Sequence, residues 1–191
     1  MVKMRRGTRK SRTTVNLYRY VIDHDMGFSP NPFHGFCTLA NCKPEIRRTA
    51  IVGDFVLGFG SAVSGIRSKL IYWLRVDEIT TYDEYWDDPR FQAKKPVVNG
   101  SHLKFHGDNI YHHNEEGALI QEPSFHSLPD GRPNPKNIKT DTSRTARVII
   151  SRTFAYYGKE AISLPPGIRE RRPERPGPSS GYRQGCKRDV H

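Results

Sequence analysis

Cys42 is the residue of this chain whose type and position most directly suggest covalent chemistry. It lies two residues before a proline that suits the start of a helix, and close to the cations Lys43, Arg47 and Arg48. The positive end of a helix and neighbouring cations lower the pKa of a thiol, which favours the reactive thiolate. Cys42 is therefore a candidate nucleophile, although spacing fixes no partner histidine for it. The alternative, for Cys37 as well, is a packing role in the core.

An acid and a histidine offer a second catalytic option, with Asp108 and His126 as the candidate pair. A metal site is not predicted. Cys37 and Cys42 are separated by four residues, but the second close pair of ligands that structural zinc sites typically use is missing. No Walker loop, Rossmann fingerprint, HExxH or GxSxG motif is present, so no cofactor is assigned.

Three cations around the expected helix start form a candidate phosphate site. They are Lys43, Arg47 and Arg48. Free N–H groups at a helix start, together with arginine side chains, suit a phosphate. The alternative is that the two arginines pair with the acidic residues between positions 77 and 88.

A pocket for a nucleobase needs an aromatic wall and a few polar groups that can read the edge of the base. Several residues of the expected loops have this chemistry. The candidates for base or nucleotide binding are Asn31, Phe33, Thr38, Asn41, Asn109 and Tyr111. Each also has a structural explanation, such as a turn before Pro32 for Asn31 or a core position for the aromatic rings.

Short runs of β-branched and aromatic residues between turn residues predict strands at 17–22, 54–60, 69–79, 109–113, 118–121, 147–151 and 153–157. The last two read as a hairpin-like pair, and Gly58 suggests a bulge or a close backbone approach. A short helix is predicted at 44–51, where Pro44 suits the first turn. A second short helix is predicted to begin at a capping box of Thr81 and Glu84 and to end before Pro89.

Strands dominate this pattern, which predicts an α+β, strand-rich fold: a small antiparallel barrel or strongly curved sheet with two short helices. Three connections, 23–43, 89–108 and 122–146, are longer than is common in compact domains. They contain aromatic residues, histidines and turn residues rather than a linker composition. We expect these loops to be ordered and to line a pocket.

The formal charge of +11 is concentrated at the two ends of the chain. Residues 1–14 carry +6 and residues 165–191 carry +4, which leaves +1 for residues 15–164. This predicts one nearly neutral domain over 15–164 between two basic disordered tails, the second rich in Pro, Gly and Arg. The tails would attract nucleic acid weakly and without sequence preference. The alternative is that both tails are solvated extensions without a function, or that residues 1–14 come from a misassigned start codon.

Three cysteines and an N-terminus without an apolar stretch give no sign of export, and a cytoplasmic location is expected. The longest strongly apolar run, 70–74, is far shorter than the roughly 20 residues of a membrane span. No membrane association is predicted.

Five sequence blocks together resemble the Nmad2 family, the second nucleotide modification associated domain. They are SPNPFHGFCTLANCKPEIRR at 29–48, GDFVLGFGS at 53–61, YWDDPRF at 85–91, GDNIYHH at 107–113 and HSLPDGRPNPKNI at 126–138. The resemblance implies an association with systems that modify DNA bases, often in phages and mobile elements. The strand pattern is also similar to PUA-like barrels, the group of EVE, YTH and ASCH domains, which recognise modified bases.

These observations lead to three functional hypotheses. The first is a PUA-like domain that recognises a modified nucleotide or a flipped DNA base with residues from 29–48, 107–113 and 126–141. The second is an enzyme of nucleotide or base modification. The third is a non-catalytic assembly component of a modification or defence system. The sequence does not define the oligomeric state.

Overall fold

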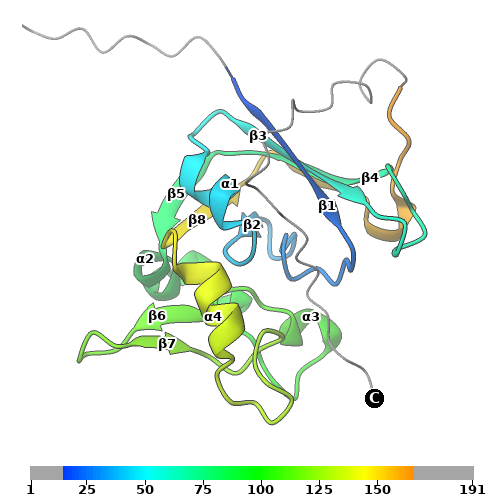
Figure 1. The fold of residues 1–191 in the computed structure, drawn as a ribbon. Coiled ribbons are helices and arrows are strands. Elements are labelled where there is room, and N and C mark those ends of the chain that lie inside the picture. Colours follow the sequence, from blue (N-terminus) through cyan, green and yellow to red (C-terminus); the bar gives the residue numbers. More distant parts are fainter. Residues whose placement is uncertain (1–14, 166–191) are drawn as a thin grey trace, which may run out of the picture.

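A computed structural model describes residues 15–165, and its largest element is a four-stranded sheet (Figure 1). The strands are β1 (Leu17–Ile22), β3 (Phe55–Gly60), β4 (Leu70–Arg75) and β9 (Phe154–Tyr156), in the order β1-β3-β4-β9. β1 and β3 are parallel because a long connection with its own secondary structure joins them, whereas the other pairs are antiparallel. The predictions of strands at 17–22 and 54–60 are confirmed.

The second sheet contains β2 (Cys37–Leu39), β8 (Arg147–Ser151) and β5 (Glu78–Thr81), in the order β2-β8-β5, and all its pairs are antiparallel. A two-stranded hairpin of β6 (Tyr111–His113) and β7 (Leu119–Gln121) lies below it in Figure 1. Over residues 15–165 these three sheets stay open. The closed barrel expected from the sequence is therefore not seen, and the expectation of a purely antiparallel arrangement is wrong at β1 and β3.

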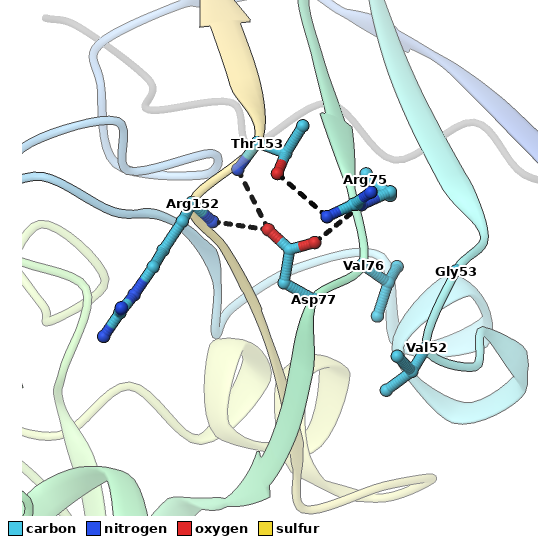
Figure 2. Close-up of a pocket in the computed structure, with 7 residues that line it drawn as sticks. All are labelled: Val52, Gly53, Arg75, Val76, Asp77, Arg152 and Thr153. Atoms are coloured by element: carbon cyan, nitrogen blue, oxygen red, sulfur yellow. Dashed lines mark hydrogen bonds and ion pairs between the residues drawn. The ribbon is translucent and has the colours of Figure 1, made fainter.

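The single strand predicted at 69–79 is in fact two strands in two sheets, β4 and β5. The chain crosses between the sheets at Val76 and Asp77. The Asp77 carboxylate accepts hydrogen bonds from the backbone N–H groups of Arg152 and Thr153, at 2.8 and 2.9 Å. It thereby fixes a second crossing, where β8 leaves one sheet and β9 enters the other (Figure 2). The predicted hairpin of 147–151 and 153–157 is thus also wrong.

The two helices predicted from the sequence are present as α1 (Pro44–Thr49) and α2 (Tyr82–Asp87). Thr81 and Glu84 form the expected capping box. The long connections contain further short helices: η1 (Pro89–Lys94), α3 (His102–Phe105) and α4 (Pro135–Thr142), with η2 (Gly158–Glu160) after β9. The prediction of only two helices was therefore too low. In the part of the chain that the structure describes, no helix is long and apolar enough to span a membrane.

The core has two main parts. One lies between the four-stranded and three-stranded sheets and includes Leu39, Val56, Leu74 and Ile149. The other packs α2 and the β6–β7 hairpin against the three-stranded sheet, mainly through aromatic rings. The three-stranded sheet lies between these clusters, since Ile149 of β8 belongs to the first and Val148 and Ile150 to the second. After β2, the edge strand of this sheet, the chain continues directly into the turn that contains Cys42. The predicted tails, apart from Pro165, lie outside the described residues.

Gly58 gives the clearest case in which the fold requires a particular residue. The register of β3 and β4 shifts between Gly58 and Phe59, as a bulge at this glycine would cause. A Cβ atom at Gly58 would lie 2.3 Å from Cε1 of Tyr72 and 2.6 Å from Cδ1 of Ile22. The absence of a side chain at Gly58 therefore leaves room for the buried ring of Tyr72 to pack against the backbone of β3.

The substitution Gly58→Ala should lower the free energy of unfolding by about 3 kcal/mol, because the ring of Tyr72 cannot move without disturbing the core. Gly65→Ala is the matched control. At Gly65 a Cβ would meet open space, and only the left-handed φ of 72° adds a cost, of about 1 kcal/mol. Urea denaturation measures both values, and equal losses would contradict the steric account.

Candidate active site

Three side chains from three separate segments meet at one point of the fold. They are Cys42, in the turn before α1, His126, in the loop after β7, and Asp141, near the end of α4. The thiol Sγ of Cys42 lies 3.7 Å from Nε2 of His126. On the other side of the ring, Nδ1 lies 2.7 Å from Oδ2 of Asp141. A thiol, an imidazole and a carboxylate are thus arranged in series.

The carboxylate of Asp141 accepts three hydrogen bonds. The backbone N–H of Cys42 donates to Oδ1 at 2.8 Å, and the Tyr111 hydroxyl donates to Oδ2 at 2.9 Å, beside the His126 ring. Burial, together with the Asp141 carboxylate, raises the pKa of Tyr111, so its hydroxyl stays a donor. Because an ionised carboxylate only accepts, we assign the imidazole proton to Nδ1. Nε2 of His126 is then the atom that can accept a proton from the thiol.

The imidazole is also held by packing and by its own backbone. The Phe28 ring lies against it, with ring centroids 4.5 Å apart. The Asn137 side chain donates to the His126 carbonyl at 2.8 Å. His126 and Asp141 are almost completely buried, with 2% and 0% exposure. A histidine whose orientation is fixed in this way suits the role of a general base.

Cys42 has the backbone strain and the accessibility expected of a reactive residue. Its φ is 54° and that of Lys43 is 41°, so two consecutive residues other than glycine lie in the left-handed region. Such strain gathers at functional sites. Cys42 is partly exposed as a residue, whereas Cys37 is fully buried in β2 and burial raises the pKa of its thiol. Of these two cysteines, Cys37 packs in the core and Cys42 is the more accessible.

The same three residues could in principle bind a metal ion, because their ligand atoms all lie within 4.8 Å of one another. The hydrogen bonds of Asp141 favour a different use, since its oxygens already accept from the Cys42 amide, Tyr111 and His126. Of the roughly four lone pairs of the carboxylate, about one is left for a metal ion. The geometry instead matches a nucleophile, a base and an orienting acid.

The three cations predicted to bind phosphate do not form one site. The Lys43 ammonium lies over the ring of Tyr20, 4.6 Å from its centroid. Arg48 is exposed and pairs with Glu45 at 2.8 Å. Arg47 is fully buried, and its guanidinium donates to protein groups. Arg47 therefore supports the turn of Cys42 from inside the fold.

Asp108, the acid proposed from the sequence as a partner of His126, belongs to a different cluster. Its carboxylate accepts from Thr38 at 2.7 Å and from Tyr85 at 2.8 Å. Lys94, which is also fully buried, donates to Thr38 and to both oxygens of Asn31. Burial raises the pKa of Asp108 and lowers the pKa of Lys94. The structure thus places Asn31, Thr38 and Asp108 in one buried polar network beneath the site.

The remaining candidates divide between the two clusters. Asn41 donates to the Asp108 carbonyl at 2.9 Å and directly precedes Cys42, so it joins the network to the thiol turn. Asn109 donates to the Tyr85 carbonyl, also at 2.9 Å. Tyr111 belongs to the thiol site, and Phe33 is half-buried. Apart from Phe33, the residues expected to contact a base directly are buried and hold the loops in place.

Two residues of these clusters were not singled out from the sequence. Asp141 lay within the expected region 126–141, and Asn134 followed by Pro135 is a helix-start pattern that could have located α4. Lys94 gave no comparable signal, because a lysine in a loop is almost always exposed.

A surface cleft of about 480 Å³ lies elsewhere, at the crossing between the two larger sheets (Figure 2). It is lined by Val52, Gly53, Arg75, Val76, Asp77, Arg152 and Thr153. Asp77 and Arg75 bond to each other and to the turn at Thr153. These polar groups hold the sheets together, and the cleft contains no thiol or imidazole.

Iodoacetamide should modify Cys42 in the native protein and leave Cys37 unmodified. Cys42 is partly exposed beside a histidine, whereas Cys37 reacts only when the sheet opens, so its rate should be lower by on the order of 10³-fold. Peptide mass spectrometry resolves these sites from Cys186. Comparable native rates for Cys37 and Cys42 would contradict the assignment.

The substitutions Asp108→Asn and Asp141→Asn should separate the two clusters. Asp108→Asn should lower the free energy of unfolding by about 3 kcal/mol, since it leaves the buried Lys94 without an anion nearby, and should leave the pH profile of Cys42 alkylation unchanged. Asp141→Asn should change that profile, because His126 loses the acceptor for Nδ1. If Asp108→Asn keeps the native structure but changes the pH profile of Cys42 alkylation, the assignment of Asp141 rather than Asp108 to the thiol site is wrong.

The comparison with family models confirms the resemblance seen in the sequence. The model of nucleotide modification associated domain 2 matches residues 14–184. Comparison with curated proteins and with solved structures gave no match. The matched region includes Cys42, His126 and Asp141, and the family description associates the chain with nucleotide modification systems. Because the match covers far more than half of its length, the chain belongs to the Nmad2 family.

Proposed function

We propose that this protein is a cysteine-dependent enzyme that modifies a nucleotide or a flipped nucleobase. Cys42 is the nucleophile, His126 the general base, and Asp141 the acid that orients the imidazole. The observation that carries the proposal is the series of contacts from Sγ to Nε2, at 3.7 Å, and from Nδ1 to Oδ2, at 2.7 Å. The same logic of nucleophile, base and orienting group defines cysteine and serine catalytic sites on unrelated folds.

The reaction begins with proton transfer from the Cys42 thiol to Nε2 of His126. The sulfur then forms a bond to an electrophilic carbon of the base or of a group donor. The electron pair displaced from that carbon goes to an adjacent ring atom or to a leaving group, which receives the proton back from His126. The Asp141 carboxylate stabilises the imidazolium between these two steps. A second, protic nucleophile then gives its proton to His126 and forms a bond to the same carbon as the C–S bond breaks. The sulfur leaves as a thiolate, which takes the proton from His126 and becomes the thiol again.

The placement of the site along the chain supports a role in nucleotide chemistry. Cys42 lies within the block 29–48, and His126 begins the block 126–138, two of the segments on which the family resemblance rests. Asp141 follows the second block by one turn of α4. The family association with nucleotide modification and the thiol arrangement therefore concern the same segments.

In this proposal most of the residues expected to bind a base instead hold the loops of the site in place. Asn31, Thr38 and Asn41 hold the loop 29–48 over the buried Asp108 network. Phe33 is the member of the set that stays partly exposed and can contact a base. Recognition of a modified base without turnover, as in PUA-like domains, would use the same loops. The basic tails would add nonspecific attraction to phosphate in either case.

Incubation with natural and modified nucleotides and with modified DNA, followed by mass spectrometry of the products, tests the proposal. Cys42→Ser should lower turnover by about 10³-fold or more, since it replaces the nucleophile at little structural cost. Cys186→Ser is the matched control, because Cys186 lies outside the family match. It should leave turnover unchanged.

Two outcomes would replace the proposal. A nucleotide-dependent thermal shift without product, equal in wild type and Cys42→Ser, would indicate a recognition domain. Neither a shift nor a product across the panel would favour an assembly component.

A further inference from the structure

Arg47 is a fully buried cation that contacts both ends of the thiol site. Its Nε donates to the Cys42 carbonyl at 2.9 Å, and one terminal nitrogen donates to the Asp141 carbonyl. The other terminal nitrogen donates to the Tyr82 hydroxyl and the Arg147 carbonyl, at 2.9 and 2.8 Å. One rigid guanidinium thus joins the residue that carries the nucleophile to the residue that carries the orienting acid.

The charge of Arg47 lacks an ordinary counter-ion. Among residues 15–165 no carboxylate forms an ion pair with it, and its partners are three carbonyls and a phenol. Burial of an unpaired charge is costly unless dipoles or nearby anions compensate for it. Two of the residues whose carbonyls it contacts, Cys42 and Asp141, have side chains that can carry negative charge.

The same guanidinium also stabilises the strained backbone. Cys42 and Lys43 have positive φ angles, and the Arg47 amide donates to the Lys43 carbonyl at 3.1 Å while its side chain binds the Cys42 carbonyl. Arg47 therefore closes the turn from both backbone and side chain. Loss of the guanidinium fork, the pair of hydrogen bonds from Arg47 to the carbonyls of Cys42 and Asp141, would let the turn relax and would move Sγ relative to His126.

We propose that Arg47 is the positioning residue of the thiol site and that its buried charge favours the thiolate of Cys42. That this effect serves catalysis rests on the proposed function, whereas the effect of Arg47 on the ionisation of the Cys42 thiol does not. The guanidinium acts through the carbonyls of Cys42 and Asp141 and touches no reacting atom. The sequence suggested both a phosphate contact and an effect on the Cys42 thiol for Arg47, and the buried guanidinium supports the second of these roles through the backbone of the turn.

Other groups near the sulfur act in both directions. The Asp141 carboxylate opposes a negative charge on Cys42, whereas His126, once protonated, and the adjacent Lys43 favour it. The phenols of Tyr20 and Tyr82 are close enough to interact with the charge of Cys42, and burial raises the pKa of both. Arg47 offsets the effect of Asp141, which lets the orienting acid and a reactive thiolate coexist.

The test is the pH dependence of Cys42 alkylation by iodoacetamide, followed for that residue by mass spectrometry of the full chain. Arg47→Met removes the charge and the fork at similar length, and Arg47→Lys keeps the charge alone. Arg48→Met is the matched control, because Arg48 is the exposed next residue. Arg47→Met should raise the midpoint by one pH unit or more, which makes alkylation at pH 7 about tenfold slower. The midpoint of Arg47→Lys should stay closer to that of the wild type, and the midpoint of Arg48→Met should equal that of the wild type.

An unchanged midpoint in Arg47→Met, with Cys37 still protected, would overturn the proposal. Cys37 reports unfolding, because it becomes reactive only when the sheets open. If neither Arg47 variant folds, the wild-type profile decides: a midpoint at or above the ordinary value of about 8.5 would overturn the proposal, and a lower one supports it. A shifted midpoint without turnover on any nucleotide would sink the proposed function and leave this inference standing.

Discussion

The buried carboxylate of Asp141 is the interaction on which the site depends. It joins the amide of Cys42, 99 residues away in sequence, to Tyr111 and to His126, 30 and 15 residues away. A carboxylate with no exposure requires such donors, since an unpaired buried charge is unfavourable by several kcal/mol. Because the buried carboxylate needs these donors, the turn of Cys42, strand β6 and the loop of His126 are held together around it.

Buried polar networks order the loops where regular secondary structure is short. Around Asp141 the fork of Arg47 holds the strained turn of Cys42, and beneath it Asp108 and Lys94 hold the segment from Asn31 to Asn41. Hydrogen-bonded networks of this kind favour one arrangement of the loops, although Oδ1 of Asn41 is buried here without a hydrogen-bond partner. The site thus gains a fixed geometry from side chains that are buried in the fold.

The sequence predicted the elements whose signals are local. The strand at 17–22, the bulge at Gly58 and the cap of Thr81 with Glu84 follow from residue types and turns, and the structure has all three. The break at Asp77 was missed because apolar residues continue across it, and only hydrogen bonds to residues 152 and 153 reveal it. Cys42 and His126 were chosen for their chemistry, but as separate options. Asp108 was preferred to Asp141, and Arg47 was expected at the surface, because one sequence does not reveal burial.

Nuclear magnetic resonance of the His126 imidazole tests the central claim most directly, namely that Cys42 and His126 form one coupled pair oriented by Asp141. The account predicts that Nδ1 carries the proton in the neutral ring and that methylthiolation of Cys42 shifts the titration of His126. A ring that is protonated at Nε2 when neutral, or whose titration is indifferent to modification of Cys42, would contradict it.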